Sequence, residues 1–243
     1  MLWLRAPTAC SSMRDVLIEA QSLNRTYRHG ETQVVALAAA RFVLSRGDRI
    51  ALGGRSGSGK TTLLHLMAGL DMPTSGTIDW PALGPRETLL PGKISMVFQT
   101  PSLLEPLTVS ENVALPVLMA DTADPGVRAS DVEGAVSAAL ARFGLEALAQ
   151  KLPEGLSGGQ MQRVAMARAA AGRPLVILAD EPTGQLDRAT GQALLDALLA
   201  HVANTPTALV IATHDPAVSA GMNTLWRMER GVLTEAGPTA RQP

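Results

Sequence analysis

The chain has 243 residues, of which 46% are hydrophobic and 18% are charged, and its formal net charge at pH 7 is -1. This length and hydrophobic content are enough for a core, as one large domain or one domain with a smaller lobe, and they exclude a disordered protein. The near-neutral charge provides no general basic surface, so we expect no nucleic acid partner.

The single cysteine, Cys10, excludes an internal disulfide framework, and it lacks the His and Cys spacing of a zinc site. Such a chain fits a reducing cytosol. The first residues include an arginine and a short apolar start but no sustained apolar stretch of a signal peptide. We expect residues 1–14 to be a disordered extension, with Met13 as an alternative start, and residues 238–243 to be a tail. The longest apolar runs are far shorter than the roughly 20 residues of a membrane span.

The first part of the folded region has the pattern of strands. Residues 15–20 (DVLIEA) and 40–48 (ARFVLSRGD) are expected to be short strands, and the second ends in a turn signal. A buried strand at residues 49–54 (RIALGG) then runs into glycines. The helix that follows has an apolar stripe at positions i, i+3, i+4 and i+7, formed by Leu63, Leu66, Met67 and Leu70. We expect Pro73 and Gly76 to stop this helix.

The middle of the chain changes from strand to helix. Residues 93–98 (KISMVF) predict another strand, and residues from about 103 to 155 have a helical pattern throughout. Two pairs have the spacing of a capping box, Thr108 with Glu111 and Ser130 with Glu133. One helical face is apolar and consists of Val132, Ala135, Val136, Ala139, Leu140 and Phe143. This pattern predicts a helical lobe inserted in an α/β core.

Strand and helix alternate again in the last third. The continuous apolar runs at residues 175–179 (LVILA) and 208–213 (ALVIAT) are typical of parallel strands that are covered on both faces. The helix between them has an apolar face formed by Leu194, Leu195, Leu198 and Val202.

The first motif that predicts a binding site is a glycine-rich segment. Residues 54–61 (GRSGSGKT) match the pattern G-x-x-x-x-G-K-[ST], between a strand and an amphipathic helix. The glycines let the backbone wrap around an anion, and the helix that begins near Lys60 adds its positive dipole end. This segment therefore predicts a triphosphate site, where Lys60 reaches the β- and γ-phosphates and the Thr61 hydroxyl ligates Mg²⁺.

Two carboxylates follow the predicted strand at residues 175–179, where ligands gather in open α/β sheets. We expect Asp180 to orient Mg²⁺ and Glu181 to polarise the attacking water as general base. The next strand ends at His214, which we expect to contact the γ-phosphate.

The sequence LSGGQ at residues 156–160, followed by MQRVAMARAA, resembles the signature of the ATP-binding cassette (ABC) family, the ATPase subunits of ABC transporters. Further elements occur in that family's order between residues 16 and 235. Tyr27 resembles the aromatic residue that stacks on adenine, and Gln99 resembles the glutamine that senses the metal and the membrane partner. Asp187 ends the loop after Glu181, and His214 resembles the switch histidine.

The resemblance implies a fold and a set of site residues. The fold is an α/β P-loop NTPase (RecA-like) core with a mostly parallel sheet, an N-terminal antiparallel β subdomain and an inserted α-helical subdomain. These lie within residues 15–237, with the helical subdomain at about 103–156. Gln99 joins Glu181 and His214 as a catalytic residue, and joins Thr61 and Asp180 at the metal. The nucleotide-binding residues are Tyr27, Gly54, Arg55, Ser56, Gly57, Ser58, Gly59, Lys60, Thr61, Thr62, Ser157, Gly158, Gly159, Gln160 and Asp187.

The signature places a second anion site at a helix N-terminus, where the Ser157 hydroxyl and the N–H groups of two glycines converge. The resemblance implies that this site serves a partner's nucleotide. Two cassettes then dimerise head to tail, with each ATP between Lys60 of one subunit and Ser157 of the other. Opening after hydrolysis would be transmitted to membrane helices through Gln99 and the helical lobe.

Within the family, TYRHGETQVVAL, LLHLMAGLDMPTSG and FQTPSLLEPLTVSENVALPVLM look most like the ATPases of lipoprotein release and macrolide efflux. In that group the membrane partner is a permease with four spans and a large extracytoplasmic domain. This implies an ATP hydrolase at the cytoplasmic face of the inner membrane that drives a separate exporter. The alternatives are the ATPase of an importer, a membrane-complex scaffold with incidental hydrolysis, and a soluble ABC ATPase that acts on nucleic acid or ribosomes.

Overall fold

The computed structural model describes residues 15–121 and 129–238. The predictions for residues 1–14, which include Cys10 and Met13, lie outside the described residues, as do those for residues 239–243. Across the described ranges, no helix has both the length and the apolar character needed to cross a membrane.

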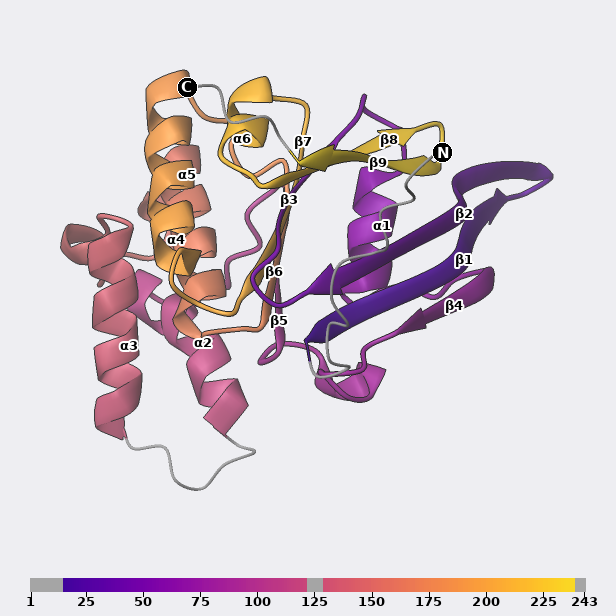
Figure 1. Ribbon diagram of the computed structural model, residues 1–243. Coiled ribbons are helices and arrows are strands. Elements are labelled where there is room, and N and C mark those ends of the chain that lie inside the picture. The colour runs from indigo at the N-terminus through magenta and orange to yellow at the C-terminus, as the bar shows by residue number, and fades with distance from the viewer. Residues whose placement is uncertain (1–14, 122–128, 239–243) are drawn as a thin grey trace, which may run out of the picture.

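A six-stranded sheet forms the centre of the molecule (Figure 1), in the order β5-β6-β7-β3-β8-β9. Its strands are β3 (Arg49–Gly53), β5 (Ile94–Val97), β6 (Val176–Asp180), β7 (Ala208–Thr213), β8 (Thr224–Glu229) and β9 (Val232–Pro238). All pairs are parallel except that of β8 with β9. Every residue of β6 and β7 is buried, as the two continuous apolar runs predicted.

A three-stranded antiparallel sheet in the order β2-β1-β4 lies beside the six-stranded sheet. It consists of β1 (Val16–His29), β2 (Thr32–Ser45) and β4 (Ser75–Asp79). β1 and β2 are much longer than the two short strands expected, because each continues into a hairpin arm without a clear alternation. The arm of β1 is mostly polar, and in the arm of β2 apolar residues such as Val34 and Val35 are exposed. The predicted turn after β2 is confirmed by Gly47, whose φ is 76°.

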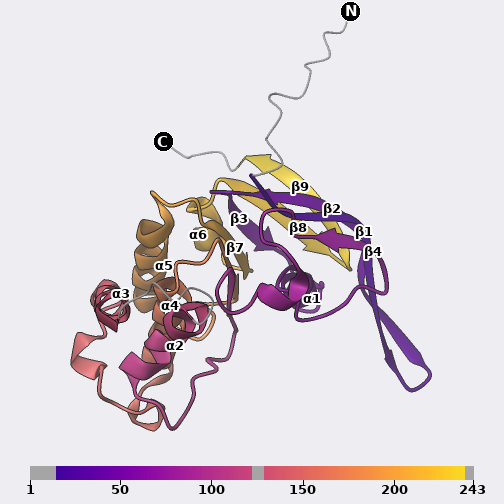
Figure 2. The same cartoon turned by 90° about the horizontal axis from the view of Figure 1, so that it is seen from below.

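Helices cover both faces of the six-stranded sheet. The helix α1 (Lys60–Met67) lies between the two sheets (Figures 1 and 2). The other face is covered by α4 (Gly158–Ala171) and α5 (Arg188–Val202), with α2 (Val109–Asp121) and α3 (Ala129–Arg142) outside α4. Shorter helices are α6 (Pro216–Ala220) and the 3-10 turns Arg86–Thr88, Glu146–Leu148 and Pro153–Gly155.

The strands divide their side chains between two hydrophobic cores. In β6, Ile177 and Ala179 pack in the core under α4 and α5, whereas Val176 and Leu178 pack in the core that contains α1. The predicted apolar face of α5, from Leu194 to Val202, is buried in the first core. This division follows from the period of two in a strand, and it holds the sheet rigidly from both sides.

The end of α1 differs from the prediction. The helix ends at Met67, before the expected stop signals Pro73 and Gly76, because Gly69 adopts a positive φ of 71°. Trp80 Nε1 and Arg86 Nε then donate to the free carbonyls of Met67 and Gly69. Of the predicted stripe, the first three residues are fully buried, but Leu70 is 46% exposed.

The helical segment follows the predicted pattern with one difference. Thr108 and Glu111 form the expected capping box, in which the Thr108 N–H donates to Glu111 Oε2 at 2.7 Å and the Glu111 N–H donates to Thr108 Oγ1 at 3.3 Å. Ser130 is already inside α3, which begins at Ala129, so it does not precede the helix as its capping-box spacing implied. Its side chain lies outside the described part of the chain.

Three strands have no counterpart in the sequence-based prediction. β4 is almost wholly exposed, so it has no apolar pattern. β8 and β9 form a hairpin around a turn at Gly231, whose φ is 82°. β9 extends to Pro238, one residue into the expected tail.

Leu66 and Leu70 provide a matched test of how α1 packs. We expect Leu66→Ala to lower the free energy of unfolding by about 2–5 kcal/mol, because it opens a cavity between the two sheets. Leu70→Ala should lower it by less than about 1 kcal/mol, because that side chain is half exposed. Urea unfolding followed by circular dichroism measures both. Equal losses would contradict the exposed position of Leu70.

Candidate active site

The carboxyl ends of three adjacent parallel strands bring the predicted catalytic residues to one edge of the sheet. Gly53, at the end of β3, pairs with Thr213 of β7, and Asp180, at the end of β6, pairs with Ala212 of the same strand. The glycine-rich loop, the two carboxylates and His214 therefore leave the sheet side by side.

Two glycines of the loop at residues 54–59 lie directly against the backbone of neighbouring strands, where a side chain has no room. A Cβ atom on Gly54 would lie 2.4 Å from the carbonyl oxygen of Met228, and one on Gly59 would lie 2.2 Å from that of Ala36. Gly59 also has a φ of 108°, which favours glycine. The loop backbone therefore packs closely against β2 and β8, and N–H groups in a loop of this kind can bind an anion.

Lys60 is the first residue of α1 and lies across this loop. Its Nζ donates to the carbonyl oxygens of Gly54 at 2.8 Å and Arg55 at 3.3 Å, and it lies 3.5 Å from Glu181 Oε1. The residue is only 6% exposed. A buried ammonium group therefore stands at the centre of the loop, where it would neutralise phosphate oxygens.

Thr61 and Asp180 form a pair of oxygen donors next to Lys60. The Thr61 hydroxyl donates to Asp180 Oδ2 at 2.6 Å, although the two residues are 119 positions apart. A hydroxyl and a carboxylate are hard oxygen ligands of the kind that Mg²⁺ takes, usually together with substrate phosphates. Among the described residues, no group of three or more His, Cys, Asp or Glu side chains could hold a metal alone.

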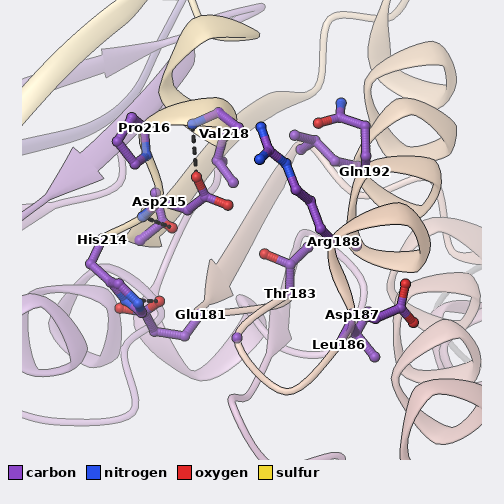
Figure 3. Close-up of a pocket in the computed structure, with 15 residues that line it drawn as sticks. Glu181, Thr183, Leu186, Asp187, Arg188, Gln192, His214, Asp215, Pro216 and Val218 are labelled. Carbon is purple, nitrogen blue, oxygen red and sulfur yellow. Dashed lines mark hydrogen bonds and ion pairs between the residues drawn. The ribbon is translucent and has the colours of Figure 1, made fainter.

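Glu181 lies between Lys60 and His214. Its Oε2 is 2.9 Å from His214 Nδ1, and Figure 3 shows the two side chains pointing toward one another. Glu181 has a φ of 45°, in the left-handed region, which costs a non-glycine residue about 1–3 kcal/mol. A hydrogen bond of 2.9 Å from its N–H to the Ala212 carbonyl helps to hold this backbone. His214 is largely exposed and borders a cavity of about 620 Å³, which Thr183, Asp187 and Arg188 also line.

The LSGGQ segment forms the N-terminus of α4. Ser157 is the N-cap, and its hydroxyl accepts the Gln160 N–H at 3.2 Å while its own N–H donates to Gln160 Oε1 at 2.9 Å. Nothing lies within 4 Å of the position of a Cβ on Gly158. The helix α4 packs in the core on one face of the six-stranded sheet, whereas α1, which follows the phosphate loop, packs in the core on the other face. The structure thus keeps the two predicted anion sites of one chain apart.

The remaining predicted residues occupy different places. Gln99 is exposed and follows β5, whose Val97 pairs with Ala179, so it leaves the same edge of the sheet as Glu181. Asp187 is the N-cap of α5, and the hydrogen bonds from the Thr190 side chain and backbone hold the pKa of its carboxyl below the ordinary value.

Tyr27 lies on β1, and its hydroxyl donates to Asp71 at 2.7 Å. Arg25 and Asp71, which contact Tyr27, were not predicted from the sequence. Their contacts join positions 44 and 46 residues apart, at a spacing that matches no motif. The one usable signal was Arg25 itself, two residues before Tyr27 and so on the same face of a strand.

Comparison with known proteins agrees with this geometry. A family model described as "ABC transporter" matches residues 37–184. The lipoprotein-releasing system ATP-binding protein LolD of Legionella pneumophila (strain Paris) is 39% identical over 228 residues, which cover 91% of this chain and 98% of LolD. The macrolide export ATP-binding/permease protein MacB of Syntrophobacter fumaroxidans is 39% identical over 235 residues, which cover 93% of this chain but 32% of MacB.

A solved structure also matches the fold. The ATP-binding cassette MJ0796, in a dimeric post-hydrolysis state bound to ADP and Pi, has a TM-score of 0.83 and 30% sequence identity. The match covers 93% of this chain and 100% of that one. The expected P-loop NTPase core, with its mostly parallel sheet, antiparallel β subdomain and helical insertion, is confirmed.

Proposed function

This chain belongs to the ABC transporter family, and from that premise we propose that it is the ATP-hydrolysing subunit that drives a separate membrane permease. The observation that carries the proposal is the convergence of Lys60, Asp180, Glu181 and His214 around one glycine-rich loop. Hydrolysis is the activity that this set of groups serves: a cation for the phosphates, a carboxylate base and a histidine beside it.

We assign the triphosphate of ATP to the loop at residues 54–62, with Lys60 neutralising the β- and γ-phosphates. Support comes from the closeness of Lys60 to two carbonyl oxygens and a carboxylate, since a cation held there meets an incoming phosphate without moving far. Ser58 adds a buried hydroxyl that has no hydrogen-bond partner in the described part of the molecule.

Thr61, Asp180 and Gln99 are the residues that we assign to Mg²⁺. The hydrogen bond between Thr61 and Asp180 supports this assignment, because it already gathers two of the three donor groups. When bound, Mg²⁺ would supply positive charge against the phosphate oxygens. Gln99, which is exposed beyond β5, is free to approach from the neighbouring strand.

Glu181 is the proposed general base. It takes a proton from the attacking water, and His214 holds one carboxylate oxygen so that the other is directed toward the loop. The strained backbone of Glu181 supports this role, since strain of this kind clusters at functional sites.

The LSGGQ segment is proposed to bind the nucleotide of a second copy of the chain. In the capping box the Ser157 hydroxyl oxygen accepts the Gln160 N–H, which leaves the hydroxyl proton and the N–H groups of Gly158 and Gly159 to donate to the partner's γ-phosphate. The separation of this segment from the chain's own phosphate loop supports binding in trans. The dimeric state of MJ0796, bound to ADP and Pi, supports the same arrangement. Asp187, at the end of the neighbouring loop, would lie at the dimer interface.

We place the subunit at the cytoplasmic face of the inner membrane, peripheral to a permease that it contacts through Gln99 and the helical lobe at residues 103–156. The relatives favour export, because they are named for a lipoprotein-releasing system and for macrolide export. MacB joins an ATP-binding part and a permease in one protein, which supports a permease as the partner of this chain.

Replacement of the general base tests the chemistry. We expect Glu181→Gln to lower the ATPase rate by about 10²–10⁴-fold, since the amide cannot accept the proton, while ATP still binds. Because the ATP that joins the two copies is not consumed, the dimer of this variant should last longer than the wild-type dimer. Size-exclusion chromatography with ATP and Mg²⁺ measures this difference. A variant with an unchanged rate would contradict the role of Glu181.

A charge placed on Gly158 tests binding in trans. We expect Gly158→Asp to abolish the ATP-dependent dimer and lower hydrolysis at least tenfold, because a carboxylate would repel the partner's γ-phosphate. Folding stability should not fall, because the new side chain has open space and an acidic residue suits the first turn of a helix. The control is Gly134→Asp, which adds the same charge at another open position, on α3. If both variants dimerise equally with ATP, the LSGGQ segment does not bind the nucleotide of the second copy.

The membrane partner can be found with the long-lived dimer. Tagged Glu181→Gln protein, captured from detergent-solubilised membranes with ATP and analysed by mass spectrometry, should retain a permease with four predicted spans and a large outer domain. A six-span permease with a binding protein would mean import. The capture of soluble factors alone would contradict a transporter subunit.

A further inference from the structure

The ring of Tyr27 is held in place by two charged side chains. Its hydroxyl donates to Asp71 Oδ2 at 2.7 Å. Arg25 Nη2 pairs with Asp71 Oδ1 at 2.8 Å, and the guanidinium carbon of Arg25 lies 4.4 Å from the centroid of the Tyr27 ring. Each of these three residues therefore contacts the other two, and we call them the Tyr27 cluster.

Asp71 is itself fixed to α1. Its Oδ1 accepts the N–H of Met72 at 2.7 Å, and its own N–H donates to the carbonyl oxygen of His65, a residue of α1, at 3.3 Å. Burial alone would raise the pKa of Asp71, but the hydrogen bonds from Tyr27 and Met72 and the charge of Arg25 hold it below the ordinary value. The carboxylate is thus ionised at neutral pH, and it ties Tyr27 to the helix that starts at Lys60.

The same stretch of sheet touches the phosphate loop. The carbonyl oxygen of Ala36 on β2 packs against Gly59, and the residues on either side of Ala36 pair with Arg25 and Thr26 on β1. Tyr27 pairs with Val34, which lies two residues before Ala36 on β2. From the spacing between strands and the rise along a strand, the Cα atoms of Tyr27 and Ala36 are about 8 Å apart. Tyr27 is 38% exposed and lines a depression of about 550 Å³, within the usual size of ligand sites.

We propose that Arg25 and Asp71 are positioning residues that hold the Tyr27 ring ready to stack on the base of the bound nucleotide. This inference rests on the proposed function, since it takes ATP as the ligand of the phosphate loop. Arg25 covers one face of the ring and Asp71 holds the hydroxyl end, so the base stacks on the face that Arg25 leaves uncovered. The ring then loses little rotational freedom on binding, which is how preorganisation raises affinity.

The test compares ATP with inorganic tripolyphosphate, which has the phosphates but no base. We expect Arg25→Met and Asp71→Ala each to weaken ATP binding by about 2- to 10-fold and to leave tripolyphosphate binding unchanged. Both dissociation constants can be measured by isothermal titration calorimetry on the full chain with Mg²⁺. The control is Arg41→Met, which removes the same charge from an exposed position on β2 and should change neither value.

A double variant separates positioning from direct contact. Tyr27→Leu should weaken ATP binding at least as much as Arg25→Met, and Arg25→Met should have no further effect once Tyr27 is replaced. Additive losses would overturn the inference, because Arg25 would then act on the nucleotide without Tyr27. The inference would also be overturned if Arg25→Met leaves the ratio of ATP affinity to tripolyphosphate affinity unchanged, which includes an equal loss for both ligands.

Lys60→Ala distinguishes failure of this inference from failure of the proposed function. That variant should weaken both ligands, because it removes the cation at the centre of the loop. If it does and Tyr27→Leu has no effect, only the role of the Tyr27 cluster is wrong. If Lys60→Ala binds ATP normally, the loop is not the nucleotide site and both proposals fail. Asp71→Asn, which keeps an acceptor for the Tyr27 hydroxyl, should retain more of the ATP affinity than Asp71→Ala and serves if the latter does not fold.

Discussion

The parallel pairing of β3, β6 and β7 is the constraint on which the candidate site depends. Three strands that run in one direction end at one edge, and each contributes a different group: a glycine-rich loop, two carboxylates and a histidine. These strands are buried on both faces, so two hydrophobic cores set the positions of the groups. The precision of the site is therefore a property of the core and not of the loops that carry it.

The charges at this edge compensate one another within the chain. Glu181 adopts a costly backbone conformation, and its carboxylate has Lys60 on one side and His214 on the other. Lys60 in turn is buried among carbonyl oxygens as well as this carboxylate. Lys60 and Glu181 therefore depend on one another, because a buried charge is tolerated only with a partner.

The sequence predicted those parts of the fold whose signals are local. β6 and β7 follow from unbroken apolar runs, and the start of α1 follows from the spacing of its glycines before Lys60. The predicted end of α1 was wrong, because a positive φ at Gly69 ends the helix before Pro73 is reached. β4 is too exposed to show a pattern, and the contact of Tyr27 with Asp71 joins residues 44 positions apart. Tertiary contacts decide such features, and a single sequence does not display them.

The glycine-rich loop is assembled from distant parts of the chain. Its Ser58 carbonyl accepts the N–H of Gly231, and the Gly231 carbonyl accepts the N–H of Ala38. The turn between β8 and β9 thus fastens the loop to β2, although it comes far later in the chain than the loop does. A chain still emerging from the ribosome has the glycines, the lysine and both carboxylates long before it has this fastening. The order of synthesis therefore delays the completed loop until the turn between β8 and β9 has been made.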